Sequence, residues 1–291
     1  MSIDRTNPVI EPFYFGPERP LYGCYHRPQQ EPPRSSAVVL CYPMGEEYIR
    51  FHRAFRQLAL QLAASGFAVL RFDFYGCGDS AGDLEQCRLA QWQADLGLAI
   101  AEARRRSGFK TVGLIGLRLG ATLAAIVAAG RDDIAALVLW DPVPSGTAHL
   151  QELAALHTSM LRRAHVLPRP PGAVASRTGG SADSSPQEIL GFPLGAGLRA
   201  DIAALDLLAL PARPAPQVLL VESNPNVTQA GVAGRLEQLG ATVRRVAVAS
   251  PQLWVWEEGL GKVLVPHGML QPITAGLARM CPPQKGGTEY L

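Results

Sequence analysis

The segment Gly116-Leu117-Arg118-Leu119-Gly120 has the spacing of a turn that presents one side chain for chemistry. An apolar run, Thr111–Ile115, precedes it, and a helix pattern of small residues, Leu119–Ala129, follows it. In a strand–turn–helix of this kind, glycines permit a tight, strained turn whose central residue is usually a serine nucleophile. Here the central residue is Arg118, whose guanidinium stays protonated and cannot attack a carbonyl. The sequence therefore excludes serine-type acyl-enzyme chemistry at this position.

Arg118 needs an anionic partner if it is buried, and two kinds of partner fit the sequence. The first is a carboxylate or phosphate of a ligand, gripped by the planar guanidinium. The second is a carboxylate of the protein, either Asp141 after the next apolar run or Glu46 or Glu47 after an earlier one. Both alternatives remain open at this level.

Pro43-Met44-Gly45-Glu46-Glu47-Tyr48 lies where a backbone N–H group could stabilise an oxyanion. We expect the N–H groups of Met44 and Leu119 to do so, with Glu47 beside them in the substrate-binding region. The alternative is an ordinary strand-to-helix loop in which Glu46 or Glu47 caps the helix.

A catalytic histidine is expected at His267, which precedes the last helix pattern of the chain. His267 could act as a general base. An Asp is missing after the run Gln217–Glu222, where Asn226 stands instead. Asp141 is therefore the alternative acid that could orient His267.

Cys77 is a nucleophile-capable side chain in the turn Asp73-Phe74-Tyr75-Gly76-Cys77-Gly78-Asp79-Ser80. Nothing in the sequence shows how its thiol would be activated. A structural role of this turn is favoured, because its glycines and Asp79 and Ser80 suit a tight turn.

Strand and helix patterns alternate along the chain, which predicts an α/β fold with a mostly parallel sheet and helices on both faces. An N-terminal antiparallel hairpin is expected at Glu11–Phe15 and Leu21–His26. Residues 1–143 and 216–291 would form the core, and residues 144–215 an inserted lid that contains a Pro-, Gly- and Ser-rich loop, Pro168–Pro186. The expected helices are Tyr48–Ser65, Gln86–Ser107, Leu119–Ala129, Ser145–Arg163, Leu198–Leu208, Val227–Leu239 and Met269–Met280.

Composition narrows the class of protein. The 291 residues carry a net charge of +2 with no basic block, which gives no electrostatic case for nucleic acid binding. No apolar run is long enough to span a bilayer. Five cysteines, an odd number without C-x-x-C spacing, predict a reduced, cytoplasmic protein with no cysteine metal site. No cofactor is expected. Low Lys beside many Ala, Arg, Pro and Gly residues suggests a bacterial source.

Together these motifs resemble the α/β-hydrolase superfamily, in its serine aminopeptidase-like branch, and within it the exosortase A system-associated hydrolases. The resemblance implies an α/β-hydrolase fold with a nucleophile elbow at Arg118, an atypical catalytic triad and a small-molecule substrate. The missing Ser and the missing acid after Glu222 depart from the superfamily's pattern. The residues that carry the resemblance are Pro43–Glu47, Phe74–Ser80, Gly116–Ala121, Leu139–Val143 and Ser145-Gly146.

Two functions follow from these observations. One is an enzyme that acts on an acyl ester, a thioester or a related carbonyl substrate, with His267 as base and Arg118 holding substrate charge. Apolar residues of the expected lid, such as Leu153 and Leu156, could then cover an acyl chain. The other is a catalytically inactive hydrolase-fold protein that binds a ligand or a protein partner.

Overall fold

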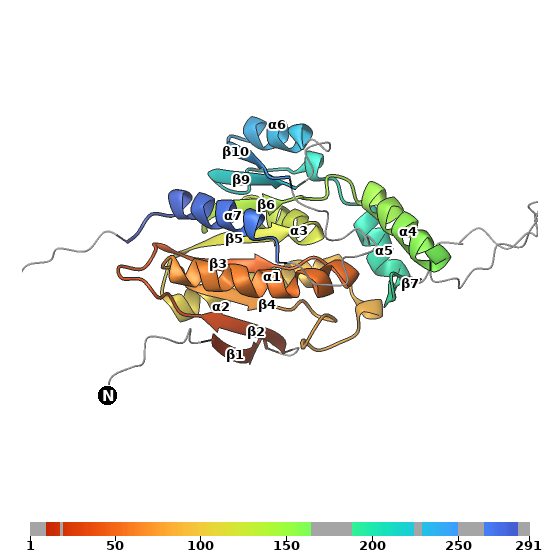
Figure 1. The fold of residues 1–291 in the computed structure, drawn as a ribbon, viewed down its shortest axis with the longest axis horizontal. Coiled ribbons are helices and arrows are strands. Elements are labelled where there is room, and N and C mark those ends of the chain that lie inside the picture. Colours follow the sequence, from red (N-terminus) through yellow and green to blue (C-terminus); the bar gives the residue numbers. More distant parts are fainter. Residues whose placement is uncertain (1–9, 18–19, 164–187, 224–228, 250–264, 285–291) are drawn as a thin grey trace, which may run out of the picture.

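Eight strands form one sheet in the order β1–β2–β4–β3–β5–β6–β9–β10 (Figure 1). The computed structural model describes residues 10–17, 20–163, 188–223, 229–249 and 265–284. The pairs β1–β2 and β2–β4 are antiparallel, and the other pairs are parallel. The predicted parallel sheet with an antiparallel N-terminal hairpin is thereby confirmed. The strands are β1 (Ile10–Phe15), β2 (Leu21–His26), β3 (Ser36–Cys41), β4 (Val69–Phe72), β5 (Thr111–Leu117), β6 (Ile134–Trp140), β9 (Gln217–Glu222) and β10 (Thr242–Ala247).

Helices cover both faces of the sheet (Figure 1). α1 (Gly45–Ala64) and α7 (His267–Met280) pack on one face. The other face is covered by α2 (Leu89–Ser107), α3 (Leu119–Ala128) and α6 (Ala230–Gln238). A short 3-10 helix, η1 (Leu84–Gln86), precedes α2.

Burial on both faces explains why the central strands are continuous apolar runs. In β3, Val38 and Leu40 pack toward α1 and α7, whereas Ala37 and Val39 pack toward α2 and α3. Successive side chains of a strand point to opposite faces, so each needs an apolar environment here.

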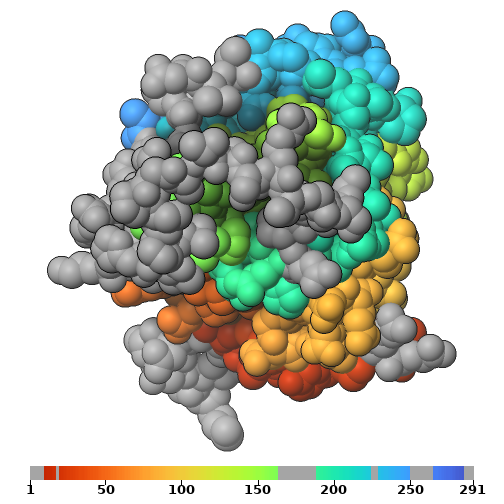
Figure 2. Space-filling view, turned by 90° about the vertical axis from the view of Figure 1, so that its right-hand side faces the viewer, coloured from red at the N-terminus to blue at the C-terminus, as the bar shows by residue number. Residues whose placement is uncertain are grey.

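The predicted lid region contains two helices that pack against each other beyond the end of the sheet (Figure 1). It comprises α4 (Gly146–Arg163), β7 (Glu188–Ile189), β8 (Phe192–Pro193), α5 (Ala196–Ala203) and η2 (Leu207–Ala209). α5 and β8 contact η1, and Figure 2 shows their teal surface beside the orange surface of the segment that contains η1. The expected loop at 168–186 lies outside the described residues, and the role of this region as a lid stays a prediction.

Among the helices that the structure describes, none is both long enough and apolar enough to span a membrane.

Candidate active site at the Arg118 elbow

Arg118 occupies a strained turn between β5 and α3. Its backbone has φ 53° and ψ −122°, a conformation that residues other than glycine rarely adopt. A Cβ atom on Gly116 would lie 2.5 Å from the backbone of Ala121, and one on Gly120 would lie 2.3 Å from the carbonyl oxygen of Tyr42. Both glycines are therefore required by close packing, as the motif predicts. The turn thus combines a strained backbone with two closely packed glycines, and its identity as a nucleophile elbow stays a prediction.

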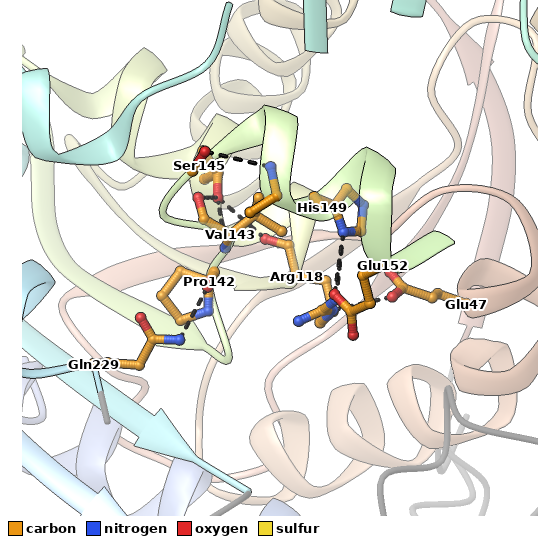
Figure 3. Close-up of polar contacts among 10 residues, drawn as sticks. Glu47, Arg118, Pro142, Val143, Ser145, His149, Glu152 and Gln229 are labelled. Atoms are coloured by element: carbon orange, nitrogen blue, oxygen red, sulfur yellow. Dashed lines mark hydrogen bonds and ion pairs between the residues drawn. The ribbon is translucent and has the colours of Figure 1, made fainter. Parts of the chain in front are cut away.

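Two carboxylates of the protein hold the Arg118 side chain (Figure 3). Its Nε donates a hydrogen bond to Oε1 of Glu47 at 3.0 Å, and its Nη2 donates to Oε2 of Glu152. Nη2 also lies 3.3 Å from Nδ1 of His149. Glu47 comes from the first turn of α1, and His149 and Glu152 come from α4. We call these four residues the Arg118 network.

The network keeps its charged groups ionised. Burial by itself would lower the pKa of the Arg118 guanidinium, but the carboxylates of Glu47 and Glu152 outweigh burial and raise it. Burial would likewise raise the pKa of Glu152, but hydrogen bonding with His149 and the charge of Arg118 lower it to about 2. One guanidinium thus faces two carboxylates, and the charge that would attract an anionic ligand is already balanced.

Asp141, the other predicted partner, points elsewhere. It follows β6 with φ 41°, and its Oδ1 accepts a hydrogen bond from the backbone N–H of Ser223 at 2.9 Å. Its Oδ2 is buried and has no hydrogen-bond partner among the described residues. Burial raises the pKa of this carboxyl. The loop beyond Asp141 is fixed by mutual hydrogen bonds between Thr122 and Val143, both at 2.9 Å. Asp141 is therefore held at the edge of the sheet rather than paired with Arg118.

His267 is the first residue of α7 and is exposed. Within the described part of the chain its side chain makes no hydrogen bond to Arg118 or Asp141. Glu222 at the end of β9 is engaged in a different way, because it accepts from the N–H of Gln229 and pairs with Arg245. Asn226 lies outside the described residues. The structure therefore assembles no His–acid pair from these side chains.

Met44 and Leu119 lie at the N-termini of two helices, as the predicted oxyanion role requires. Met44 is the residue before α1, and Leu119 is the first residue of α3. α1 begins earlier than the sequence predicted, so Glu47 belongs to its first turn, where the helix dipole favours negative charge. Whether the two N–H groups bind an oxyanion stays a prediction.

Cys77 lies in the turn after β4 and is not part of the Arg118 network. It packs partly buried against the core, and burial raises the pKa of its thiol. A thiol with a raised pKa is a poor nucleophile at neutral pH. No cluster of His, Cys, Asp and Glu side chains among the described residues has an arrangement that could hold a metal ion.

His149 and Glu152 are the site residues that the sequence analysis missed. Both lie within the expected helix Ser145–Arg163, but neither was a candidate site residue. Helical spacing places His149, Glu152 and the buried Leu153 on one face of α4, since residues three and four apart are neighbours on a helix. That polar pair beside an apolar residue was the available signal.

A small cavity lined by described residues lies beside Glu47 of the network. It has a volume of about 20 Å³ and lies between the start of α1 and the β7–β8 pair, lined by Met44, Glu47, Leu153 and Phe192 among others. A water molecule needs roughly 10–15 Å³ measured in this way. This cavity can therefore hold about one water and no acyl group.

Comparisons with known proteins agree with this architecture. The family described as serine aminopeptidase, S33, matches residues 32–185, just over half of the chain. A search of curated protein sequences finds no match.

Solved structures similar to this chain include hydrolases from distant organisms. Ferulic-acid-bound Est1E from Butyrivibrio proteoclasticus is 16% identical, with a TM-score of 0.60, covering 92% of this chain and 96% of that one. An esterase from Pyrococcus furiosus is 14% identical, with a TM-score of 0.60 and coverages of 94% and 92%. Mouse α/β hydrolase domain-containing protein 10 is 15% identical, with a TM-score of 0.53 and coverages of 94% and 99%. These likenesses show the fold, and the family match shows that this chain belongs to the serine aminopeptidase S33 family of the α/β-hydrolase superfamily.

Proposed function

We propose that this chain is a hydrolase-fold protein without acyl-transfer chemistry at its elbow, and that it acts by binding a small molecule or a protein partner. The observation that carries this proposal is the pairing of Arg118 with Glu47 and Glu152. A guanidinium at the nucleophile position cannot attack a carbonyl, and its own protein carboxylates occupy the charge that could hold a substrate.

The charge around the elbow also opposes ester hydrolysis. An oxyanion held by Met44 and Leu119 would develop close to the carboxylate of Glu47, whose side chain is 4% exposed. Oε2 of Glu47 is buried without a hydrogen-bond partner among the described residues. Catalysis of acyl transfer depends on donors aimed at the developing negative charge, so a buried carboxylate there raises the barrier.

A second candidate function is the enzyme without a serine nucleophile, acting on an acyl ester, thioester or related carbonyl compound. His267 would be its general base, Arg118 would hold substrate charge, and Met44 and Leu119 would supply the oxyanion site. The observation that favours it is the unpaired, buried Oδ2 of Asp141, an acceptor suited to orienting a histidine. With this second function we also propose that the chain is one of the exosortase A system-associated hydrolases.

We also propose a cytoplasmic location. All five cysteines are free in the structure, as expected in a reducing compartment.

One set of assays separates the two functions. The purified protein, His267→Ala and Asp141→Asn are tested on a panel of aryl esters and acyl thioesters, with a serine esterase as positive control. The binding proposal predicts no turnover above the buffer rate by any of the three. Turnover by wild type that is lost in both variants would overturn it in favour of the His267 enzyme.

A covalent probe tests the elbow independently of the substrate panel. A fluorophosphonate should not label wild type, because no activated serine stands at position 118. The comparison variant is Arg118→Ser combined with Glu47→Gln and Glu152→Gln, which removes the carboxylates together with their cation. Labelling of wild type would contradict our interpretation of the elbow.

A further inference from the structure

A second buried arginine, Arg71, faces a cavity on the other side of α1. This cavity, of about 410 Å³, lies between the N-terminal hairpin and α1, and we call it the hairpin cavity. Its lining combines rings and apolar groups with charged side chains, including Tyr22, Tyr42, His52, Arg56, Arg71 and Asp79. None of the residues that line it belongs to the Arg118 network.

The described partners of Arg71 are neutral. Its Nε donates to Nε2 of His26 at 3.1 Å, and its Nη1 donates to the hydroxyl of Tyr42 at 2.9 Å. Burial, followed by the charges of Arg71 and Arg56, lowers the pKa of His26 to about 4. Burial raises the pKa of Tyr42 to about 12. At neutral pH, therefore, neither partner balances the charge of the guanidinium.

The charge of Arg71 is unusual because it is buried without a nearby carboxylate among the described residues. Arg71 is 7% exposed, and no carboxylate of the described residues lies within ion-pair distance of it. A guanidinium has five N–H donors, of which the two bonds above use two, so three remain for a ligand. Buried charges are normally paired, and an anion in the hairpin cavity would complete the pairing.

A second guanidinium lies at the same cavity. Arg56 projects from α1 as an exposed residue and forms no ion pair with a described residue. Two guanidiniums on neighbouring elements are a recurring arrangement for binding a carboxylate or phosphate.

Two carboxylates limit the charge of the ligand. Asp73 is directed into its own turn, because Oδ1 accepts from the Tyr48 hydroxyl at 2.9 Å and Oδ2 accepts from the Asp79 N–H at 3.1 Å. Asp79 lines the hairpin cavity and is exposed. The site therefore suits one compact anionic group and disfavours a polyanion, which would be repelled by these acids.

We propose that the hairpin cavity binds a small organic anion whose carboxylate or phosphate head contacts Arg71 and Arg56 and whose body lies against the rings of Tyr22 and Tyr42. Its volume lies within the roughly 300–1,000 Å³ typical of small-molecule sites. Its walls supply both apolar groups and rings and polar side chains that could orient a ligand.

Calorimetric titration with simple probes tests this site. Benzoate and phenyl phosphate represent the two head groups, and benzamide is the neutral control. Wild type should bind at least one of the two anions saturably and should not bind benzamide. Binding of benzoate alone identifies a carboxylate ligand, and binding of phenyl phosphate alone identifies a phosphate ligand.

Two variants locate the binding. Arg56→Ala removes an exposed side chain with little risk to folding, and Arg53→Ala is its matched control on the same helix, since Arg53 is exposed and does not line the hairpin cavity. Arg71→Lys keeps the charge and removes the planar fork. We expect Arg56→Ala and Arg71→Lys to weaken binding about tenfold or more, and Arg53→Ala to bind as wild type does.

Three results would overturn the proposal: no saturable binding of either anion by wild type, equal binding of benzamide, or wild-type affinity in Arg56→Ala. The last result is decisive even if Arg71→Lys fails to fold, as circular dichroism would reveal.

Discussion

The two buried arginines of this chain are held in opposite ways. Arg118 donates to the carboxylates of Glu47 and Glu152, whereas Arg71 donates to a neutral histidine and a neutral phenol. Both side chains lie beside α1, one toward the elbow and one toward the N-terminal hairpin.

The difference bears on where a ligand can bind. A buried cation that the protein itself neutralises has no attraction left for a ligand, and removing its partner is costly. A buried cation that rests on neutral acceptors retains its field, because the hydrogen bonds satisfy donors without cancelling charge. Arg118 is therefore unsuited to binding an anionic ligand, whereas Arg71 is suited to binding one.

The largest effect is expected from Arg118→Met. This substitution leaves Glu47 buried without its cation and should lower the free energy of unfolding by roughly 3–5 kcal/mol. Urea unfolding measures the loss. The triple variant with Glu47→Gln and Glu152→Gln should recover much of it, because it leaves no uncompensated charge. A single variant as stable as wild type would mean that Arg118 is not held by these acids.

Glu47→Gln should have the next largest effect, a loss of about 1–3 kcal/mol. The amide can still accept from Nε of Arg118, but the charge is gone from a nearly inaccessible position. Glu46→Gln is the matched control in the same turn, since Glu46 forms a partly exposed pair with Arg50 and should cost at most about 0.5 kcal/mol. If both variants lost the same free energy of unfolding, the charge of Glu47 would not be needed to neutralise Arg118.

Arg71→Met should cost less than Arg118→Met, about 1 kcal/mol, because it breaks two hydrogen bonds to neutral partners and strands no charge. Thermal unfolding of both variants under one buffer makes the comparison direct. A loss for Arg71→Met as large as that for Arg118→Met would break the contrast between the two arginines.

The smallest effect is a pH dependence that comes from Glu152. Its pKa in the folded chain is about 2, below the ordinary 4.5, so folding favours the ionised form. The resulting stability is present above pH 4.5 and is lost as the pH falls toward 2. Since the side chain is 39% exposed, solvent screening should keep this contribution below about 1 kcal/mol.

Glu152→Gln should therefore melt below wild type at pH 7, and the gap should shrink at pH 3. A gap that stays constant between these two pH values would show that Glu152 carries no charge-dependent stability.

The sheet and the tight glycine turn around Arg118 were predictable because they depend on local patterns. Continuous apolar runs identify strands buried on both faces, and glycines at positions 116 and 120 are required by backbone contacts. Glu47 was one of the expected partners of Arg118 because residues after neighbouring parallel strands meet at one edge of the sheet.

The remaining features depend on distances that no local pattern encodes. Glu152 reaches Arg118 only because α4 lies beside the turn that follows β5, and the position of such a helix is set by packing. The positive φ of Asp141 directs its carboxylate to Ser223, a choice that the residue type does not reveal. The position of Arg71 beside a cavity could not be predicted for the same reason, because a cavity forms between elements of the fold rather than within one.

The strained backbone at position 118 is maintained by its neighbours and not by its side chain. The backbone of Ala121 and the carbonyl of Tyr42 pack closely against Gly116 and Gly120. These contacts do not depend on which side chain position 118 carries. The strained turn is thus a preformed position for a new reactive side chain, which could be introduced once Glu47 and Glu152 are replaced. Such a variant would test whether this turn can support a new reaction without a change in the fold.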